Sequence, residues 1–397
     1  METNPAKQYS ARDLFEGLPT SLKAWLRQLL CNNPNVHQNK PAIFTQIFYQ
    51  LSQYSYQTHL KLGADLKDDE KARELRSKGN QMYHPRVMRY TDALRYYNEA
   101  IAFAQNGSPD RGITYANRSI ICLEQGMYRD CLINIRLARE SNYPKRFEGR
   151  LALREAKAKQ ACLAIIATKQ YVKGGNNSRN HRNHRNHRNH RHAKDSKIVQ
   201  LNVPLPDANY FNLHHGVECG KYKWDKGGML DEHRYTMCDY CRTKCLHILI
   251  PCEGCTMVMY CSEECMYQAQ LQYHRCECPI IRNMWNVAGE YAVTVWRTIA
   301  KVISSYPRLQ PMKEHLEMTL QLNEICNIAT TSLAIAPYHV DIEKAMIFKT
   351  FLAAIMHRVV MDGTKLGPIC AYDPAMNRLL CDVILHYLNV FDELEST

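Results

Sequence analysis

Seven cysteines and one histidine between Cys238 and Cys278 follow the spacing C-x2-C-x10-C-x2-C-x5-C-x3-C-x8-H-x3-C. They are Cys238, Cys241, Cys252, Cys255, Cys261, Cys265, His274 and Cys278. Thiolates and imidazole suit Zn²⁺, and eight such donors suffice for two four-coordinate sites. Because closed sites leave no position for a catalytic water, the spacing predicts two structural zinc ions.

The location that we expect for the chain indicates that the clustered cysteines bind metal rather than form disulfides. The N-terminal sequence "METNPAKQYSARDLF" lacks the apolar region of a secretory signal, and no apolar run approaches the roughly 18–20 residues that span a bilayer. We therefore expect a cytoplasmic or nuclear protein without a membrane partner, in which clustered cysteines bind metal.

Nine of the 17 cysteines fall within this cluster, so two of them are left over. These are Cys245 and Cys276, and Cys276 is the alternative ligand because it lies between His274 and Cys278. The cysteines elsewhere are expected to be small buried hydrophobic residues.

The order and spacing of the eight residues resemble the MYND zinc finger. The resemblance implies interleaved sites, with Cys238, Cys241, Cys261 and Cys265 at one ion and Cys252, Cys255, His274 and Cys278 at the other, so that neither half folds alone. It also implies a docking surface for a proline-containing peptide or a deacetylase-type corepressor; a purely architectural role is the alternative. The stretch "SEECMYQAQLQYH" predicts a short helix capped by Ser262, with Ala269 and Tyr273 facing inward.

The composition fits a soluble globular protein of two or three domains, with 397 residues, 45% hydrophobic and 23% charged. The net charge is +12, but five arginines belong to the run "RNHRNHRNHRNHRH" from Arg179 to His192, which predicts a disordered linker. Metal capture or nucleic-acid contact by this run stays open. Nucleic-acid binding by the finger is disfavoured, because "CEGCTMVMYCSEEC" carries three acidic residues and no Lys or Arg.

Helical periodicity repeats in the segment that precedes the linker. The triplets Ala93, Tyr97, Ala100 and Cys131, Ile135, Ala138 share an i, i+4, i+7 pattern, 38 residues apart. The pattern resembles tetratricopeptide repeats, which are helix pairs of about 34 residues. An ordinary helical bundle is the alternative.

The repeat resemblance implies a more specific site, the carboxylate clamp with which some members hold acidic C-terminal peptides. Its positions would be Arg76, Asn80, Asn117, Arg146 and Arg150. Residues four apart share a helix face, and Arg and Asn donate hydrogen bonds to carboxylates. The implied partner is the acidic C-terminal peptide of a heat-shock chaperone; ordinary exposed polar residues are the alternative.

Repeats followed by a MYND finger and helices resemble the SET-and-MYND protein-lysine methyltransferases, in the branch with N-terminal repeats. In that family, a Gly-x-Gly-Leu motif before the finger and an Asn-His-Ser-Cys motif after it hold S-adenosylmethionine. This chain has "GKYKWDKGGML" in place of the first motif, and the second does not occur. We therefore expect a mainly α-helical, zinc-binding adaptor without activity of its own. The alternative is an S-adenosylmethionine-dependent lysine methyltransferase acting on histone or non-histone proteins.

The predicted organisation has six parts. They are an N-terminal helical segment at 1–71, tetratricopeptide-like repeats at 72–171, the Arg/Asn/His-rich linker at 172–197, a degenerate SET-like segment at 198–237, the MYND finger at 238–278, and a helical region resembling the family's SET insert at 279–397.

Overall fold

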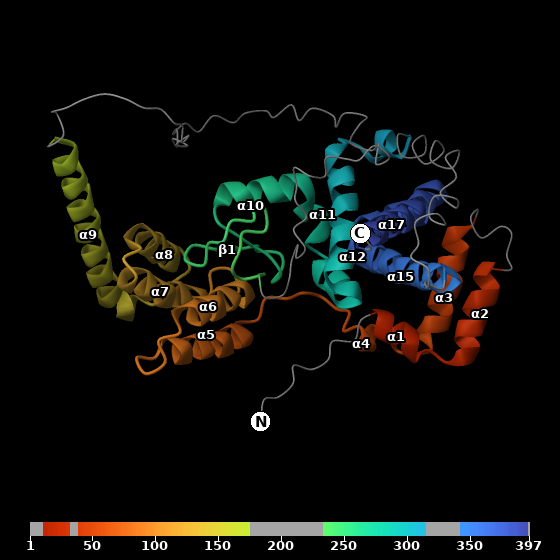
Figure 1. Ribbon diagram of the computed structural model, residues 1–397, viewed down its shortest axis with the longest axis horizontal. Coiled ribbons are helices and arrows are strands. Elements are labelled where there is room, and N and C mark those ends of the chain that lie inside the picture. Colours follow the sequence, from red (N-terminus) through yellow and green to blue (C-terminus); the bar gives the residue numbers. More distant parts are fainter. Residues whose placement is uncertain (1–10, 32–38, 175–232, 315–341, 396–397) are drawn as a thin grey trace. The chain divides into compact units, whose positions relative to one another are not determined.

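The structure, a computed structural model, describes residues 11–31, 39–174, 233–314 and 342–395 (Figure 1). Most of the predicted linker and SET-like segment, at 175–232, lies outside the described residues. The described part is 74% helical with almost no sheet, which confirms the mainly α fold class. It divides into two compact units, one from Ala72–Leu205 and the other from Met1–Lys71 together with Pro206–Thr397.

The unit Ala72–Leu205 is an array of helices in which each packs against the next. Helix α6 packs against α7, α7 packs against α8, and α8 packs against α9. The helices are α5 (Asp69–Tyr83), α6 (Tyr90–Phe103), α7 (Pro109–Glu124), α8 (Tyr128–Glu140) and α9 (Glu148–Gly174), with a 3-10 turn at Lys145–Phe147 before the last.

The two predicted apolar triplets are buried. Every member is 1% exposed or less, on α6 for the first triplet and α8 for the second. On α5, a side chain at Gly79 would place its Cβ only 2.5 Å from the Tyr97 ring. The small residue therefore lets α5 and α6 approach closely.

The other unit contains the finger and a long helix that follows it. Strands β1 (Ile250–Pro251) and β2 (Met259–Tyr260) pair antiparallel, with Ile250 opposite Tyr260. Then come α10 (Glu263–Ala269), a π-helical turn (Gln270–His274), α11 (Arg275–Glu277) and α12 (Ile281–Ser305). Helix α12 is bent at Ala288 and Gly289 and packs against the π-helical turn and α11.

Helices from the two ends of the sequence complete this unit. Contacts join α3 to α15 and α17, and α12 to both of these C-terminal helices. Phe15 packs against Phe348 and Phe351, with ring centroids 5.5 and 5.2 Å apart, and Lys40 pairs with Asp382. The helices are α1 (Ala11–Gly17), α2 (Thr20–Cys31), α3 (Lys40–Ser52), α4 (Tyr56–His59), α15 (Ile342–Gly363), α16 (Leu366–Tyr372) and α17 (Pro374–Glu395).

Several cysteines outside the finger lie in these helical cores. Cys122, Cys131, Cys370 and Cys381 are buried, as expected of small hydrophobic residues. Burial raises the pKa of the Cys122 thiol to about 12 and that of Cys370 to about 11, so both stay protonated at neutral pH.

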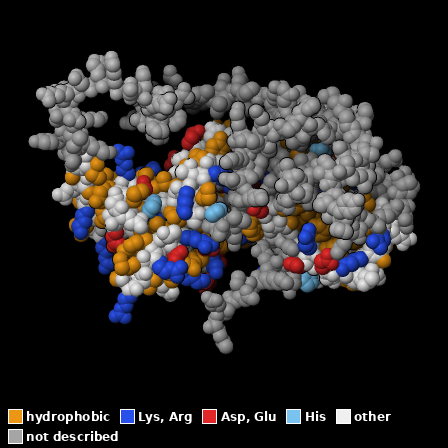
Figure 2. Space-filling view, viewed as in Figure 1, with side chains coloured by type: hydrophobic (Ala, Val, Ile, Leu, Met, Phe, Trp, Pro, Cys, Tyr) orange, Lys and Arg blue, Asp and Glu red, His pale blue; other side chains and the backbone are white. Residues whose placement is uncertain are grey.

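No helix in the described part of the chain is long and apolar enough to cross a membrane. On the face shown in Figure 2, Lys and Arg side chains are interspersed with apolar and acidic ones.

Candidate metal centre

The structure brings the eight predicted ligands together in two groups of four. Within each group the ligand atoms all lie within 4.8 Å of one another. The groups are Cys238, Cys241, Cys261 and Cys265, hereafter the all-cysteine group, and Cys252, Cys255, His274 and Cys278, hereafter the histidine group. The membership is the interleaved one that the MYND resemblance implies.

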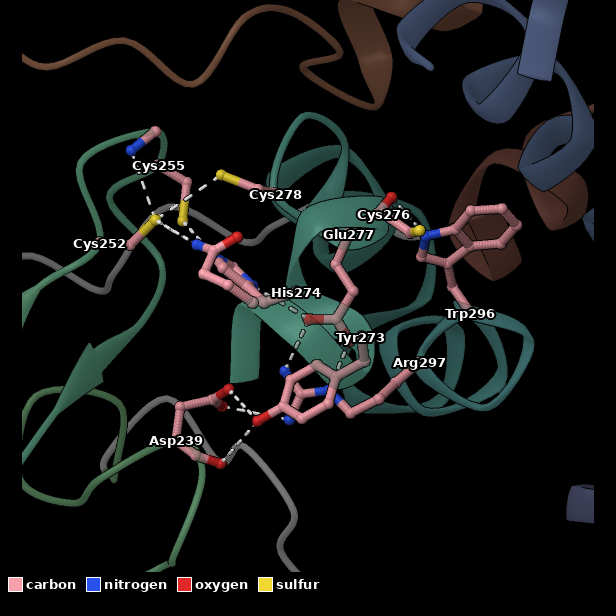
Figure 3. Close-up of polar contacts among 12 residues, drawn as sticks. Asp239, Cys252, Cys255, Tyr273, His274, Cys276, Glu277, Cys278, Trp296 and Arg297 are labelled. Atoms are coloured by element: carbon pink, nitrogen blue, oxygen red, sulfur yellow. Dashed lines mark hydrogen bonds and ion pairs between the residues drawn. The ribbon is translucent and has the colours of Figure 1, made fainter. Parts of the chain in front are cut away.

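The spacing within the groups suits tetrahedral zinc. With Zn–S bonds of about 2.3 Å, the sulfurs of a tetrahedron lie about 3.8 Å apart. In the all-cysteine group, Cys261 Sγ lies 3.6 Å from Cys241 Sγ and 3.5 Å from Cys265 Sγ. In the histidine group, Cys252 Sγ lies 3.7 Å from Cys278 Sγ (Figure 3).

The imidazole of His274 completes the histidine group through its Nε2 atom. This atom lies 3.7 Å from Cys255 Sγ and 3.2 Å from Cys252 Sγ, while the ring is fully buried. Since three thiols and one imidazole nitrogen converge, the donor set and its dimensions fit a zinc ion with four protein ligands.

The turn between Cys252 and Cys255 is shaped for this convergence. The Gly254 backbone N–H donates to Cys252 Sγ at 3.3 Å. A Cβ at Gly254 would lie 2.6 Å from Cys278 Sγ, so only glycine leaves room for the fourth ligand.

The predicted cap at the start of α10 is confirmed. Ser262 Oγ accepts a hydrogen bond from the Cys265 backbone N–H at 3.2 Å, which fixes a ligand of the all-cysteine group in the first turn. Ala269 and Tyr273 are buried, as the sequence predicts.

A buried carboxylate orients the His274 ring. Glu277, on α11, places Oε2 3.3 Å from His274 Nδ1, and its side chain is 1% exposed. With Nδ1 carrying the proton and donating to Glu277, Nε2 is left to bind metal, which is the usual arrangement around a zinc-bound histidine.

One arginine joins both groups to α12. Arg297 Nη2 donates to Glu277 Oε2 at 3.0 Å, and Nη1 donates to Asp239 Oδ1 at 3.1 Å. The guanidinium also lies over the Tyr273 ring, 4.6 Å from its centroid, and Tyr273 donates to Asp239 Oδ2 at 3.1 Å (Figure 3). Asp239 follows the ligand Cys238, so a single cation contacts the immediate surroundings of both groups.

The charges in this network hold one another ionised. Burial by itself raises the pKa of Glu277, but the adjacent Arg297 more than offsets it, and the pKa lies below its ordinary value. Burial also raises the pKa of Asp239, but the charges of Arg297 and Arg242 outweigh this effect, and the pKa lies below its ordinary value. Both carboxylates are therefore ionised although they are buried.

Sequence reasoning missed Asp239, Glu277 and Arg297. Glu277 carries a signal, because it stands three residues after His274 in a helical stretch and the two side chains share a face. Arg297 carries none, since only packing of α12 against the finger brings it to the ligands.

The two leftover cysteines lie outside both groups. Cys276 Sγ lies 3.7 Å from Ser304 Oγ, and Cys245 Sγ donates to the Thr243 carbonyl at 3.2 Å. His274 and Cys278, rather than Cys276, are the residues that meet Cys252 and Cys255.

The predicted clamp residues are only partly brought together. Asn117 donates to Asn80 Oδ1 at 2.9 Å, but Arg76 is held by Asp110 at 2.8 Å. Arg146 and Arg150 both lie over the Phe147 ring, 4.8 and 5.7 Å from its centroid. Among the described residues, no hydrogen bond joins these two arginines to the asparagines.

Comparison with known proteins finds several relatives of the same name, each aligned with somewhat more than half of this chain. The protein-lysine N-methyltransferase SMYD4 of Danio rerio is 26% identical over 255 residues, which cover 58% of this chain and 32% of that protein. The human protein of the same name is 24% identical over 287 residues, 54% of this chain and 34% of that protein. The homologues thus confirm the resemblance to SET-and-MYND methyltransferases, and the chain spans about a third of their length.

A further match concerns a short stretch. A tetratricopeptide repeat protein 4 homolog of Dictyostelium discoideum is 31% identical over 78 residues, 19% of this chain and 20% of that protein. No protein-family model matches the chain, and no solved structure matches it significantly.

Proposed function

We propose that this chain is a docking adaptor built on two zinc ions, in which a MYND finger binds one peptide partner and tetratricopeptide-like repeats bind another. The observation that carries the proposal is the pair of converging ligand groups, each with four protein donors. A zinc ion with four protein ligands has no position for substrate or water, so it stabilises a surface rather than performing chemistry.

The metal would make up the core of the finger. Chelation by side chains from the turns that follow the two strands, from α10 and from the π-helical turn ties segments together that are too short to bury an apolar core. We propose that the surface of the finger binds the kind of partner that the MYND resemblance implies, a proline-containing peptide or a deacetylase-type corepressor.

In the helical array, Asn80 and Asn117 favour the binding of a peptide partner. Asn80 Oδ1 accepts hydrogen bonds from both Tyr97 Oη and Asn117 Nδ2, each at 2.9 Å. Because its oxygen is committed as an acceptor, Asn80 offers its amide N–H groups from an exposed position on α5. Amide donors from α5 and α7 thus lie side by side, which suits a carboxylate such as the acidic tail of a heat-shock chaperone.

Peptide binding is tested on the full chain by calorimetry with an acidic C-terminal peptide and with the same peptide amidated at its C-terminus. We expect binding of the free-acid peptide, and at least a tenfold loss in Asn117→Ala and in Arg150→Ala. The control Arg136→Ala changes an exposed residue of α8. Equal affinity of all variants, or of both peptides, would remove the clamp from the proposal.

Methyl transfer is the second candidate function, and it is favoured by the homologues, which are protein-lysine N-methyltransferases. Under this alternative the chain binds S-adenosylmethionine and modifies histone or non-histone lysines. Calorimetry with S-adenosylmethionine separates the two candidates: the adaptor gives no heat, whereas micromolar binding favours the enzyme. Elemental analysis of the same sample should find two zinc ions per chain under either candidate.

A further inference from the structure

A stretch without regular structure, Lys61–Lys67, connects α4 to α5 and contacts both the histidine group and α12. We call it the bracing segment. Nothing in its sequence, "KLGADLK", predicts a role in the finger, which lies more than 180 residues further along the chain.

Asp65 attaches the bracing segment to the residue after the ligand Cys255. Its Oδ2 accepts the Thr256 backbone N–H at 2.8 Å, and its Oδ1 accepts the Thr256 hydroxyl at 2.7 Å. Arg282 on α12 pairs with the same carboxylate at 3.2 Å and also donates to the Thr256 hydroxyl. The Asp65 side chain is 8% exposed, so these contacts replace water almost completely.

Lys67 contacts two of the metal ligands directly. Its Nζ donates to the Cys252 carbonyl at 2.5 Å and to the Cys255 carbonyl at 2.7 Å. One ammonium therefore bridges the backbone on both sides of the turn that presents these thiols. Three thiolates and a neutral imidazole around Zn²⁺ carry a net charge of −1, so the position of the cation is also electrostatically favourable.

The opposite end of the bracing segment is fixed to the first turns of α12. Asn286 Nδ2 donates to the Lys61 carbonyl at 2.9 Å, and the Gly63 N–H donates to Asn283 Oδ1 at 3.0 Å. The segment is thus held at both ends. Its hydrogen bonds to Cys252, Cys255 and Thr256 reach the turn that carries two ligands of the histidine group.

We infer that Asp65 and Lys67 are positioning residues of the histidine group, and that metal binding at this group in turn fixes the bracing segment. The inference rests on the proposed zinc binding. The two residues touch no ligand atom of the metal; they act by holding the backbone of Cys252 and Cys255 at the separation that the ion requires. Residues that orient ligands in this way commonly contribute 10- to 100-fold to metal affinity.

The test uses the full chain loaded with ¹¹³Cd²⁺, whose NMR resonance reports the donors and geometry at each site separately. Wild type is compared with Lys67→Met and Asp65→Asn, and with Leu66→Ala, whose side chain is 73% exposed within the same segment. We expect the resonance of the histidine group alone to shift or broaden in the first two variants. We also expect one of the two zinc ions to transfer to a chelator about tenfold faster, while Leu66→Ala behaves as wild type.

A conservative variant separates positioning from folding. Lys67→Arg keeps a cationic donor near the two carbonyls, so it should restore most of the slow zinc transfer that Lys67→Met loses. Hydrogen exchange gives the reciprocal readout: removal of zinc from wild type should increase exchange at the Gly63 amide.

The outcomes distinguish the inference from the proposed function. If wild type binds no metal, the proposed function fails, and the inference fails with it. If wild type binds two ions but Lys67→Met and Asp65→Asn match Leu66→Ala, only the inference is overturned. The same holds if both cadmium resonances change equally, because the effect would then be general destabilisation.

Discussion

Arg297 donates to Glu277 at 3.0 Å, and this contact joins the helix after the finger to the carboxylate that orients the His274 ring. The arginine is 3% exposed and its partner 1%. Because Arg297 also contacts Asp239, the finger and α12 share a buried charge network rather than an apolar seam alone.

Replacement of Arg297 by Met is expected to destabilise the unit that contains the finger by about 3–5 kcal/mol. The change leaves Glu277 and Asp239 buried and ionised without their counter-ion. Urea unfolding of the zinc-loaded chain measures the loss. Arg358→Met is the control, since Arg358 is 50% exposed in its pair with Asp362 and should cost no more than about 1 kcal/mol. Equal losses in the two variants would show that the network does not act as described.

Replacement of Glu277 by Gln is expected to lower zinc affinity by about 10- to 100-fold at the histidine group. The variant removes the charged acceptor that holds His274 Nδ1–H and leaves Nε2 less well oriented. Competition with a chromophoric chelator measures the affinity. Glu264→Gln changes an exposed carboxylate on α10 and should retain wild-type affinity. A Glu277→Gln variant that binds both ions as tightly as wild type would contradict this assignment.

Replacement of Gly254 by Ala is expected to reduce the zinc content below two ions per chain. The new Cβ would lie 2.6 Å from Cys278 Sγ and displace that ligand. Elemental analysis after gel filtration gives the zinc content. Gly149→Ala is the matched control, because no atom lies within 4 Å of its Cβ; it should keep both ions and stabilise α9 by about 0.5–1 kcal/mol. If Gly254→Ala binds two zinc ions tightly, a side chain at this position does not displace Cys278.

The stability of the unit that contains the finger is expected to fall as the pH drops below about 6.5, in part because of His357. Burial lowers the pKa of His357, which lies on α15 with 8% exposure. Its Nε2 lies 2.7 Å from Asn377 Oδ1. Below the pKa of about 6.5 in the unfolded chain, the unfolded state binds a proton that the folded state resists, so unfolding becomes easier.

His357→Gln removes this proton uptake and keeps an amide donor for Asn377. Stability measured by urea unfolding between pH 5.5 and pH 7.5 should therefore depend less steeply on pH in this variant. Identical slopes in wild type and His357→Gln would show that other groups cause the whole dependence.

Local chemistry along the sequence was enough to predict the candidate metal ligands and the buried helix faces. Cysteines separated by two residues are close in space whatever the rest of the fold does, and the spacing limited the candidate ligands to eight residues, with Cys276 as an alternative. The cap at Ser262 and the buried faces of α6 and α8 were predictable for the same reason: they depend on residues within a few turns of each other.

Only the tertiary structure decided what surrounds those ligands. Arg297 lies 20 residues beyond Glu277, and Lys67 lies 185 residues before Cys252, so no local spacing connects them. The same is true of Asp110, which pairs with Arg76 in the array from 34 residues away. Short-range geometry is set by covalent distance. These contacts arise only when α12 and the bracing segment pack against the finger within one unit, and when the helices of the other unit pack against one another.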